Sequence, residues 1–146
     1  MFNLSVSSVM EKAKVLIADP ATTVFEASKL MAQKKVGAVM IVKDNRLVGI
    51  FTERDVVFRV VAMDRDARTT QLHEVMTEDP RTISPDKPFG LALMMMHDHG
   101  FRHVPVVKHG KAVGIVSARH ALDPALEEFG CEVSRRKQFH SMASRT

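Results

Sequence analysis

Residues 49–55 read Gly-Ile-Phe-Thr-Glu-Arg-Asp and gather a hydroxyl, a guanidinium and a carboxylate within a short segment. Gly49 allows another group to approach the backbone closely. At the start of a helix, free N–H groups attract phosphate oxygens, and Thr52 and Arg54 can add two further donors. Asp55 can accept hydrogen bonds from both hydroxyls of a ribose, as acidic residues do in dinucleotide-binding folds. Phosphate donors beside a diol acceptor predict a nucleotide site.

The same segment has a second interpretation. Thr52-x-x-Asp55 also matches a capping box, in which the two side chains satisfy the N–H groups of the helix itself. The sequence leaves both roles open.

A related segment occurs at residues 114–120, Gly-Ile-Val-Ser-Ala-Arg-His. It keeps the glycine, a hydroxyl at Ser117 and a guanidinium at Arg119, but His120 stands where the first segment has Asp55. A neutral imidazole cannot chelate a diol as a carboxylate does. We therefore expect two half-sites that differ.

Both segments belong to a longer internal repeat. Residues 20–57 align with residues 85–122 at an offset of 65, with ten identical pairs in 38 positions, against about two expected by chance. The dipeptides Val9-Met10 and Val75-Met76 precede the two copies. One structural unit used twice predicts two lobes related by a pseudo-twofold axis, with a cleft between them as the natural ligand site.

Each copy predicts the order strand, helix, strand, strand, helix, and therefore an α/β fold. Apolar residues at helical spacing predict a helix over 23–35 with Thr23 in a capping arrangement, and a matching helix that begins near Pro88. Further helices are predicted to begin at Thr52 and Ser117, the second with a restart at Asp123-Pro124.

Two continuous apolar runs, at 38–42 and 104–107, predict strands that are buried on both faces. Polar turns lead from these runs into second strands at 47–51 and 112–116, so that each copy contains a hairpin. Because Pro105 has no N–H for a sheet ladder, we expect its strand to be open or edge-like at that point.

Composition favours an intracellular, cytoplasmic protein. The chain has 146 residues, 45% of them hydrophobic, and its one cysteine, Cys131, excludes an intrachain disulfide and fits a reducing compartment. No signal peptide is expected, and no apolar run approaches the roughly 20 residues of a membrane span. The net charge of +4 and the pI near 9.5 favour anionic partners, but the cations at 135–137 fall short of a nucleic-acid-binding block.

Neither catalysis nor metal binding is predicted. The sequence contains no Gly-x-Ser-x-Gly, His-Glu-x-x-His, Walker-type or Gly-x-Gly-x-x-Gly motif. His97 and His99 do not share a helix face at a spacing of two residues, so they predict no metal site. His103 lies in a predicted cleft strand, where either contact with a base or phosphate or simple packing is open.

Taken together, these features resemble a tandem pair of cystathionine-beta-synthase (CBS) domains. The resemblance rests on the doubled Gly-hydrophobic-x-Thr/Ser-x-x-Asp pattern, the doubled Val-Met, and residues 102–107, which are similar to the family's central strand. It implies two pseudo-twofold-related units, each a small mixed sheet with packed helices. The boundaries are unit 1 at 7–63, a linker at 64–72, unit 2 at 73–126, and a partly disordered C-terminal tail at 127–146.

The resemblance also implies a disc-shaped arrangement, usually a homodimer, that binds adenine nucleotides in clefts between the lobes. In that family the Thr and Asp of the motif hold ribose and phosphate, which corresponds here to Thr52 and Asp55. The family's first and central strands hold the adenine. The corresponding residues are Ile17, Ala18, Ala38, Val39 and Met40 in the first copy, and Ile83, Ser84, His103, Val104 and Pro105 in the second. His120 and Met40 depart from the family pattern, the latter replacing the proline found at Pro105.

The sequence therefore predicts a regulatory module, not an enzyme, whose cleft binds AMP, ADP or ATP, or alternatively NAD or S-adenosylmethionine. The predicted nucleotide-binding set is completed by Gly49, Arg54, Ser117, Arg119 and His120. No catalytic cofactor is predicted, and the expected partners are a second copy of the chain and an unidentified protein, with no membrane. The alternative from another class is a ligand-free dimerisation module whose basic tail contacts a protein or nucleic acid.

Overall fold

The computed structural model describes residues 2–10 and 15–143, apart from the side chains of 122–131. The first sheet has four strands in the order β1-β2-β3-β4. Its strands are β1 (Ile17–Ala18), parallel to β2 (Ala38–Lys43), then β3 (Arg46–Thr52) and β4 (Thr77–Glu78), each antiparallel to its neighbour. Asp44 and Asn45 join β2 to β3 with φ angles of 52° and 61°, as a type I′ hairpin turn requires.

The second sheet repeats the hairpin with β5 (His103–Lys108) and β6 (Lys111–Ser117). Ile83 takes the place of β1 as an isolated parallel bridge to β5. In the first sheet the N–H of Met40 donates to a backbone carbonyl next to β1, whereas Pro105 at the corresponding position has no N–H. The edge predicted to be open at Pro105 is therefore covered by a single bridge where the first sheet has a paired strand.

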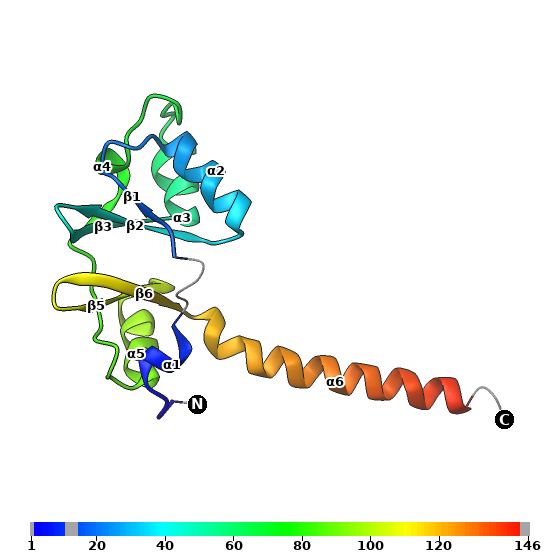
Figure 1. Ribbon diagram of the computed structural model, residues 1–146. Coiled ribbons are helices and arrows are strands. Elements are labelled where there is room, and N and C mark those ends of the chain that lie inside the picture. Colours follow the sequence, from blue (N-terminus) through cyan, green and yellow to red (C-terminus); the bar gives the residue numbers. More distant parts are fainter. Residues whose placement is uncertain (1, 11–14, 144–146) are drawn as a thin grey trace.

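A helix covers the outer side of each sheet, as the apolar spacing predicted (Figure 1). α2 (Val24–Lys34) begins at Thr23, whose Oγ1 accepts the N–H of Glu26 at 3.2 Å. α5 (Phe89–His99) ends at Gly100, whose φ of 72° suits a left-handed helix cap. The buried faces carry equivalent residues, namely Val24, Ala27 and Met31 in α2 and Phe89, Ala92 and Met96 in α5.

Each core is completed by a short segment from the start of the other copy. α1 (Val6–Val9) packs on the second core, where Val6 is fully buried beside Phe89. α4 (Leu72–Val75) packs on the first core, and β4 then completes the first sheet. Packing therefore crosses the sequence boundaries drawn around units 1 and 2.

A backbone contact fixes the start of α4. The N–H of Gln71 donates to Oε2 of Glu74 at 2.7 Å. This hydrogen bond holds the pKa of the Glu74 carboxyl below its usual value, because the ionised form is the better acceptor.

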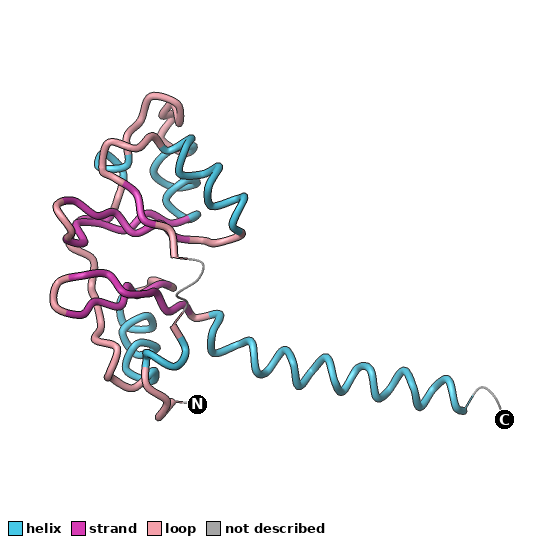
Figure 2. Tube along the Cα trace, in the orientation of Figure 1, coloured by secondary structure: helices cyan, strands magenta, loops and turns pink. Residues whose placement is uncertain are grey.

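The two sheets face each other at the centre of the molecule, and Figure 2 shows the helices of each lobe on the far side of its own sheet. Between the sheets, Ala38, Ile50 and Ile115 form a small buried cluster. The predicted arrangement of two similar α/β units about a common centre is confirmed.

Helical segments follow the second hairpin strand in both units. After β3 come α3 (Glu53–Asp55) and the π-helical segment η1 (Val56–Val61). After β6 comes α6 (Arg119–Ala143), one continuous helix of 25 residues that projects away from the sheets (Figure 1). Among the described residues, no helix is long and apolar enough to cross a membrane.

α6 is continuous where the sequence predicted a helix restart at Asp123-Pro124, whereas the partly disordered tail at 127–146 stays a prediction. The structure is helical through Ala143, and residues 144–146 lie outside the described residues. Ion pairs of 3.7 Å and 3.2 Å join Glu132 to Arg135 and Arg136, one helical turn away. Such pairs stabilise a helix that is exposed to solvent.

Candidate functional site

Two cavities are lined by residues of both units, and each contains the start of one motif helix. The smaller has a volume of about 610 Å³ and is called here the Asp55 cavity, and the larger, of about 760 Å³, is called the His120 cavity. Residues of the segments 50–59, 77–81 and 99–103 line the Asp55 cavity. Residues of the segments 15–16, 35–40, 102–103 and 115–120, together with Glu53, line the His120 cavity.

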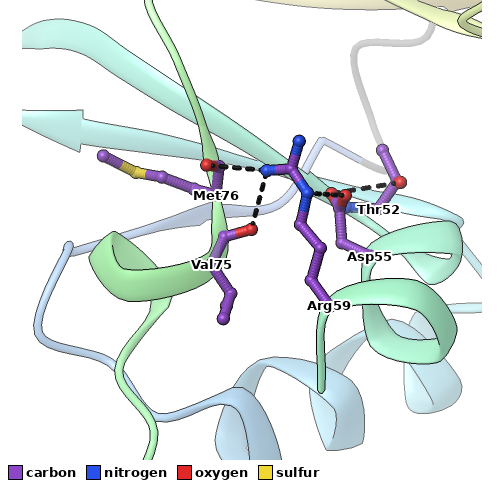
Figure 3. A network of polar contacts seen from close by, with 5 residues as sticks. All are labelled: Thr52, Asp55, Arg59, Val75 and Met76. Carbon is purple, nitrogen blue, oxygen red and sulfur yellow. Dashed lines mark hydrogen bonds and ion pairs between the residues drawn. The ribbon is translucent and has the colours of Figure 1, made fainter. Parts of the chain in front are cut away.

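The carboxylate of Asp55 is held by three donors (Figure 3). The N–H of Thr52 donates to Oδ2 at 2.8 Å, and Thr52 Oγ1 donates to the same oxygen at 3.3 Å. Arg59 Nε lies 3.4 Å from Oδ1, and the Asp55 side chain is 13% exposed. The capping role that the sequence left open is therefore present in the fold.

Arg59 links this carboxylate to the other end of the first core (Figure 3). Its Nη1 donates to the carbonyl oxygens of Val75 at 3.1 Å and Met76 at 2.9 Å, where α4 ends and β4 begins. Carbonyls at a helix C-terminus have no partner within the helix and favour a cation. Arg59 thus joins the motif to the segment that leads into unit 2. The spacing of four residues between Asp55 and Arg59 was the sequence signal for this pair.

Arg54 reaches from unit 1 to unit 2. Its Nη1 donates to the carbonyl oxygen of Gly100 at 3.4 Å, and its guanidinium lies 5.2 Å from the ring centroid of Phe58. The residues on either side of Gly100 in the sequence, His99 and Phe101, have stacked rings with centroids 5.7 Å apart and an interplanar angle of 6°. All five residues line the Asp55 cavity, which therefore combines cations with flat aromatic surfaces.

The second motif repeats the first with a different acceptor. The N–H of Ser117 donates to Nδ1 of His120 at 2.9 Å, in the place where the N–H of Thr52 donates to Asp55. The imidazole therefore caps the helix start as the carboxylate does, but without a negative charge.

The structure divides the predicted site residues among three places. Thr52, Arg54, Asp55 and His103 line the Asp55 cavity. Ala38, Met40, His103, Ser117, Arg119 and His120 line the His120 cavity. Lining neither cavity are Ile17, Ala18, Val39, Gly49, Ile83, Ser84, Val104 and Pro105. The first-copy strand residues that reach a cavity are thus separated from Asp55.

Strand alternation explains part of this division. Successive side chains point to opposite faces, so Met40 faces the His120 cavity while Val39 packs in the first core at 2% exposure. Val104 likewise packs in the second core. At Gly49, an added Cβ would overlap Sδ of Met76 and lie 3.1 Å from the Thr77 carbonyl oxygen, so the glycine accommodates β4.

Sequence reasoning missed several cavity residues, among them Lys35, Arg59, Arg81, His99, Phe101 and Arg102. Two of them carried a local signal, because Arg59 lies four residues after Asp55 and Arg102 begins the segment 102–107 that resembles the family's central strand. Among the described residues, no group of three or more His, Cys, Asp or Glu side chains is arranged to hold a metal ion.

Comparison with known families decides the relationship. The CBS domain family model matches residues 6–62 and 72–126, which together make up most of the chain. The chain belongs to the CBS domain family. The mitochondrial CBS domain-containing protein CBSX3 of Arabidopsis thaliana is 33% identical to this CBS pair over 118 residues, which cover 77% of the chain and 57% of that protein.

Other relatives and solved structures agree. A 17.7 kDa protein of Acidianus ambivalens is 36% identical over 129 residues, 84% of this CBS pair and 77% of that protein. A conserved protein of Pyrococcus horikoshii has a crystal structure with a TM-score of 0.78 and 29% identity, covering 86% of this chain and 94% of that one. A CBS domain protein of Pyrobaculum aerophilum, complexed with AMP, gives a TM-score of 0.73 and 26% identity over 80% of this chain and 89% of that one.

Proposed function

We propose that this CBS pair is a non-catalytic regulatory module that binds an adenine nucleotide in the Asp55 cavity. AMP, ADP and ATP are the favoured ligands, and NAD and S-adenosylmethionine are the alternatives. The observation that carries the proposal is the Asp55 carboxylate in a cavity lined by four arginines, namely Arg54, Arg59, Arg81 and Arg102. A carboxylate accepts hydrogen bonds from a ribose diol, and arginine binds phosphate through paired donors.

The other walls of the cavity suit a purine base. Phe58, Phe101 and Ile50 add aromatic and apolar surface to the arginines. Ligand sites of this kind combine apolar walls with a few polar groups that fix orientation. The AMP complex of the Pyrobaculum aerophilum protein supports an adenine ligand.

Regulation follows from the position of the cavity between the units. Arg54 already contacts unit 2 through Gly100, so a phosphate that recruits its guanidinium acts on a contact between the lobes. A ligand moves a conformational equilibrium only through different affinities for the two states, and such a contact provides the difference. In this proposal a homodimer carries the change to a protein partner.

Thermal denaturation with AMP, ADP and ATP tests the binding. A ligand at 100 times its Kd stabilises by about 2.7 kcal/mol, which raises Tm by about 5 to 10 °C for a chain of this size. Asp55→Asn keeps an acceptor for the Thr52 N–H but loses the charge, so we expect AMP affinity to fall at least about tenfold. Equal Tm shifts in the wild type and Asp55→Asn would contradict the proposed site.

Asp44→Asn is the matched control. Asp44 lies exposed in the turn between β2 and β3, at a φ of 52° that asparagine also tolerates. This variant removes the same charge away from the cavity and is expected to bind AMP as the wild type does. A comparable loss of affinity in Asp44→Asn would assign the effect to overall charge.

A second candidate is a ligand-free assembly module. Its support is the Asp55 cap, which gives the motif a purely structural role, together with the exposed apolar residues Val57, Val61 and Met63. For this candidate, millimolar adenine nucleotides leave Tm unchanged, and Asp55→Asn affects only the stability of the chain.

A further inference from the structure

The two cavities contain equivalent segments of the internal repeat, so they can be compared residue by residue. The N–H of Thr52 donates to Asp55 Oδ2 at 2.8 Å in one cavity, and the N–H of Ser117, at the equivalent position, donates to His120 Nδ1 at 2.9 Å in the other. A carboxylate that caps in this way still has a second oxygen, here Oδ1, which Arg59 Nε approaches at 3.4 Å and which keeps acceptor capacity for a ligand. Nδ1 of His120 is already used as an acceptor, and Nε2 of a neutral imidazole is a donor. The His120 side chain therefore cannot accept from both hydroxyls of a diol.

We propose that the His120 cavity binds a phosphorylated nucleoside whose 2′,3′-diol donates no hydrogen bonds to the side chain at position 120. The exchange of Asp55 for His120 between the copies is then what sets the sugar specificity of each cavity. This inference rests on the proposed function, because it assumes that the Asp55 carboxylate accepts hydrogen bonds from the ribose hydroxyls in the smaller cavity. It assigns to the larger cavity ligands such as deoxynucleotides or nucleotides with a substituted 2′ or 3′ oxygen.

Charge supports a phosphate ligand in the His120 cavity. Lys35, Arg102 and Arg119 line it, against one carboxylate, that of Glu53. The Asp55 cavity has four arginines against three carboxylates. An anion in the larger cavity therefore meets less opposing negative charge, and the histidine in place of an aspartate is one cause.

The remaining walls can take a base. Leu16, Val36, Met40 and Ile115 add apolar surface to the cations that line the His120 cavity. With a volume of about 760 Å³ it is larger than the Asp55 cavity and within the usual range for small-molecule sites. Base and phosphate can thus be recognised while the His120 side chain itself offers no acceptor for a diol.

Reciprocal substitution tests the inference on the full chain by isothermal titration calorimetry with AMP and 2′-deoxy-AMP. In Asp55→Asn, where binding is left to the His120 cavity, we expect the two Kd values to agree within about twofold. Adding His120→Asp restores a capping carboxylate that accepts from the 2′-hydroxyl. The preference for AMP over 2′-deoxy-AMP is then expected to rise at least about tenfold.

Two further variants, both in the Asp55→Asn chain, locate the effect. His109→Asp makes the same chemical change in the exposed β5–β6 turn and is expected to leave the ratio of the two Kd values unchanged. Arg119→Gln removes a cation of the His120 cavity and is expected to weaken both ligands equally. Circular dichroism melting confirms that each variant is folded before titration.

The outcomes separate this inference from the proposed function. A wild-type chain without Asp55-dependent AMP binding refutes the proposed function. If Asp55-dependent binding is present, a tenfold preference of Asp55→Asn for AMP overturns the inference about the His120 cavity. So does a complete lack of binding by Asp55→Asn, or a Kd ratio that His120→Asp leaves unchanged.

Discussion

At Asp55, one carboxylate serves both the fold and the proposed ligand. Its two oxygens offer about four lone-pair directions, and Thr52 and Arg59 already direct three donors at them. A ribose diol brings two donors, so at least one existing contact must give way. The Thr52 hydroxyl at 3.3 Å is the easier of the two Thr52 contacts to replace, since the backbone N–H is fixed by the helix start. In the proposed complex, nucleotide binding is therefore coupled to the cap.

Arg59→Gln tests this coupling at the residue scale. The variant removes the partner of Asp55 Oδ1 and the donor to Val75 and Met76, which is expected to lower the free energy of unfolding by about 1 to 2 kcal/mol. The looser Asp55 carboxylate is also expected to bind AMP more weakly. Urea denaturation and calorimetric titration measure the two effects.

Arg46→Gln is the control for Arg59→Gln. Arg46 is exposed at the start of β3, away from both cavities, so its substitution is expected to change neither quantity. If Arg46→Gln and Arg59→Gln have the same stability and affinity, the network of Figure 3 does not contribute to either property.

At the scale of elements, β3 fixes the position of the first motif, because the strand ends at Thr52, where the motif helix begins. It pairs with β2 on one side and with β4 on the other, where Gly49 lies opposite Glu78. Because β4 follows α4, the sheet of unit 1 is closed by the segment that starts unit 2. The motif has a glycine at this position because Met76 and Thr77 lie so close that they leave no room for a Cβ.

Gly49→Ala is expected to lower the free energy of unfolding by about 1 to 3 kcal/mol, because its Cβ must displace Met76 and approach a backbone carbonyl. Gly49 lines neither cavity, so the AMP affinity of the folded variant is expected to stay close to that of the wild type. A lower midpoint of urea denaturation with unchanged calorimetric Kd is the expected pair of results. A large loss of AMP affinity without loss of stability would instead indicate that Gly49 contributes to the phosphate-binding site.

At the scale of the whole molecule, η1 carries exposed apolar side chains beside the motif. Val57 is 56% exposed and Val61 69% exposed, and Met63 follows them at 67%. A contiguous exposed apolar surface is characteristic of a protein interface. η1 directly follows the helical turn α3 that begins after Thr52, so pairing through η1 would connect the Asp55 cavity with the proposed homodimer.

The double variant Val57→Glu, Val61→Glu is expected to convert the proposed homodimer into a monomer, because it places charges in the proposed apolar contact. Size-exclusion chromatography with light scattering measures the mass. Met142→Glu on α6 changes a residue that is 70% exposed and leaves η1 intact, so it is expected to remain dimeric. Dissociation by Met142→Glu alone would assign the dimer contact to α6.

Much of the fold could be predicted because its signals are local. The spacing of Ala27 and Met31 shows the helix, the polar turn at Asp44 shows the hairpin, and the offset of 65 shows that the unit is used twice. The candidate site was predicted only in part. Thr52, Arg54 and Asp55 were found because they lie within one motif, whereas Arg81 and Arg102 come from other segments and join Asp55 only through folding.

The sequence by itself determined the repeat, the elements of each unit and the difference between Asp55 and His120, because these depend on residue type and on spacing along the chain. Tertiary structure alone decided that Met40 and Asp55 line different cavities, that α1 and α4 each cover the other copy's core, and that Arg59 joins Asp55 to Met76. The physical reason is that the two lobes meet face to face and bring together segments that are far apart in the sequence. No spacing pattern along the chain marks such segments as neighbours. Packing across that contact, rather than local preference, selects which side chains share a cavity.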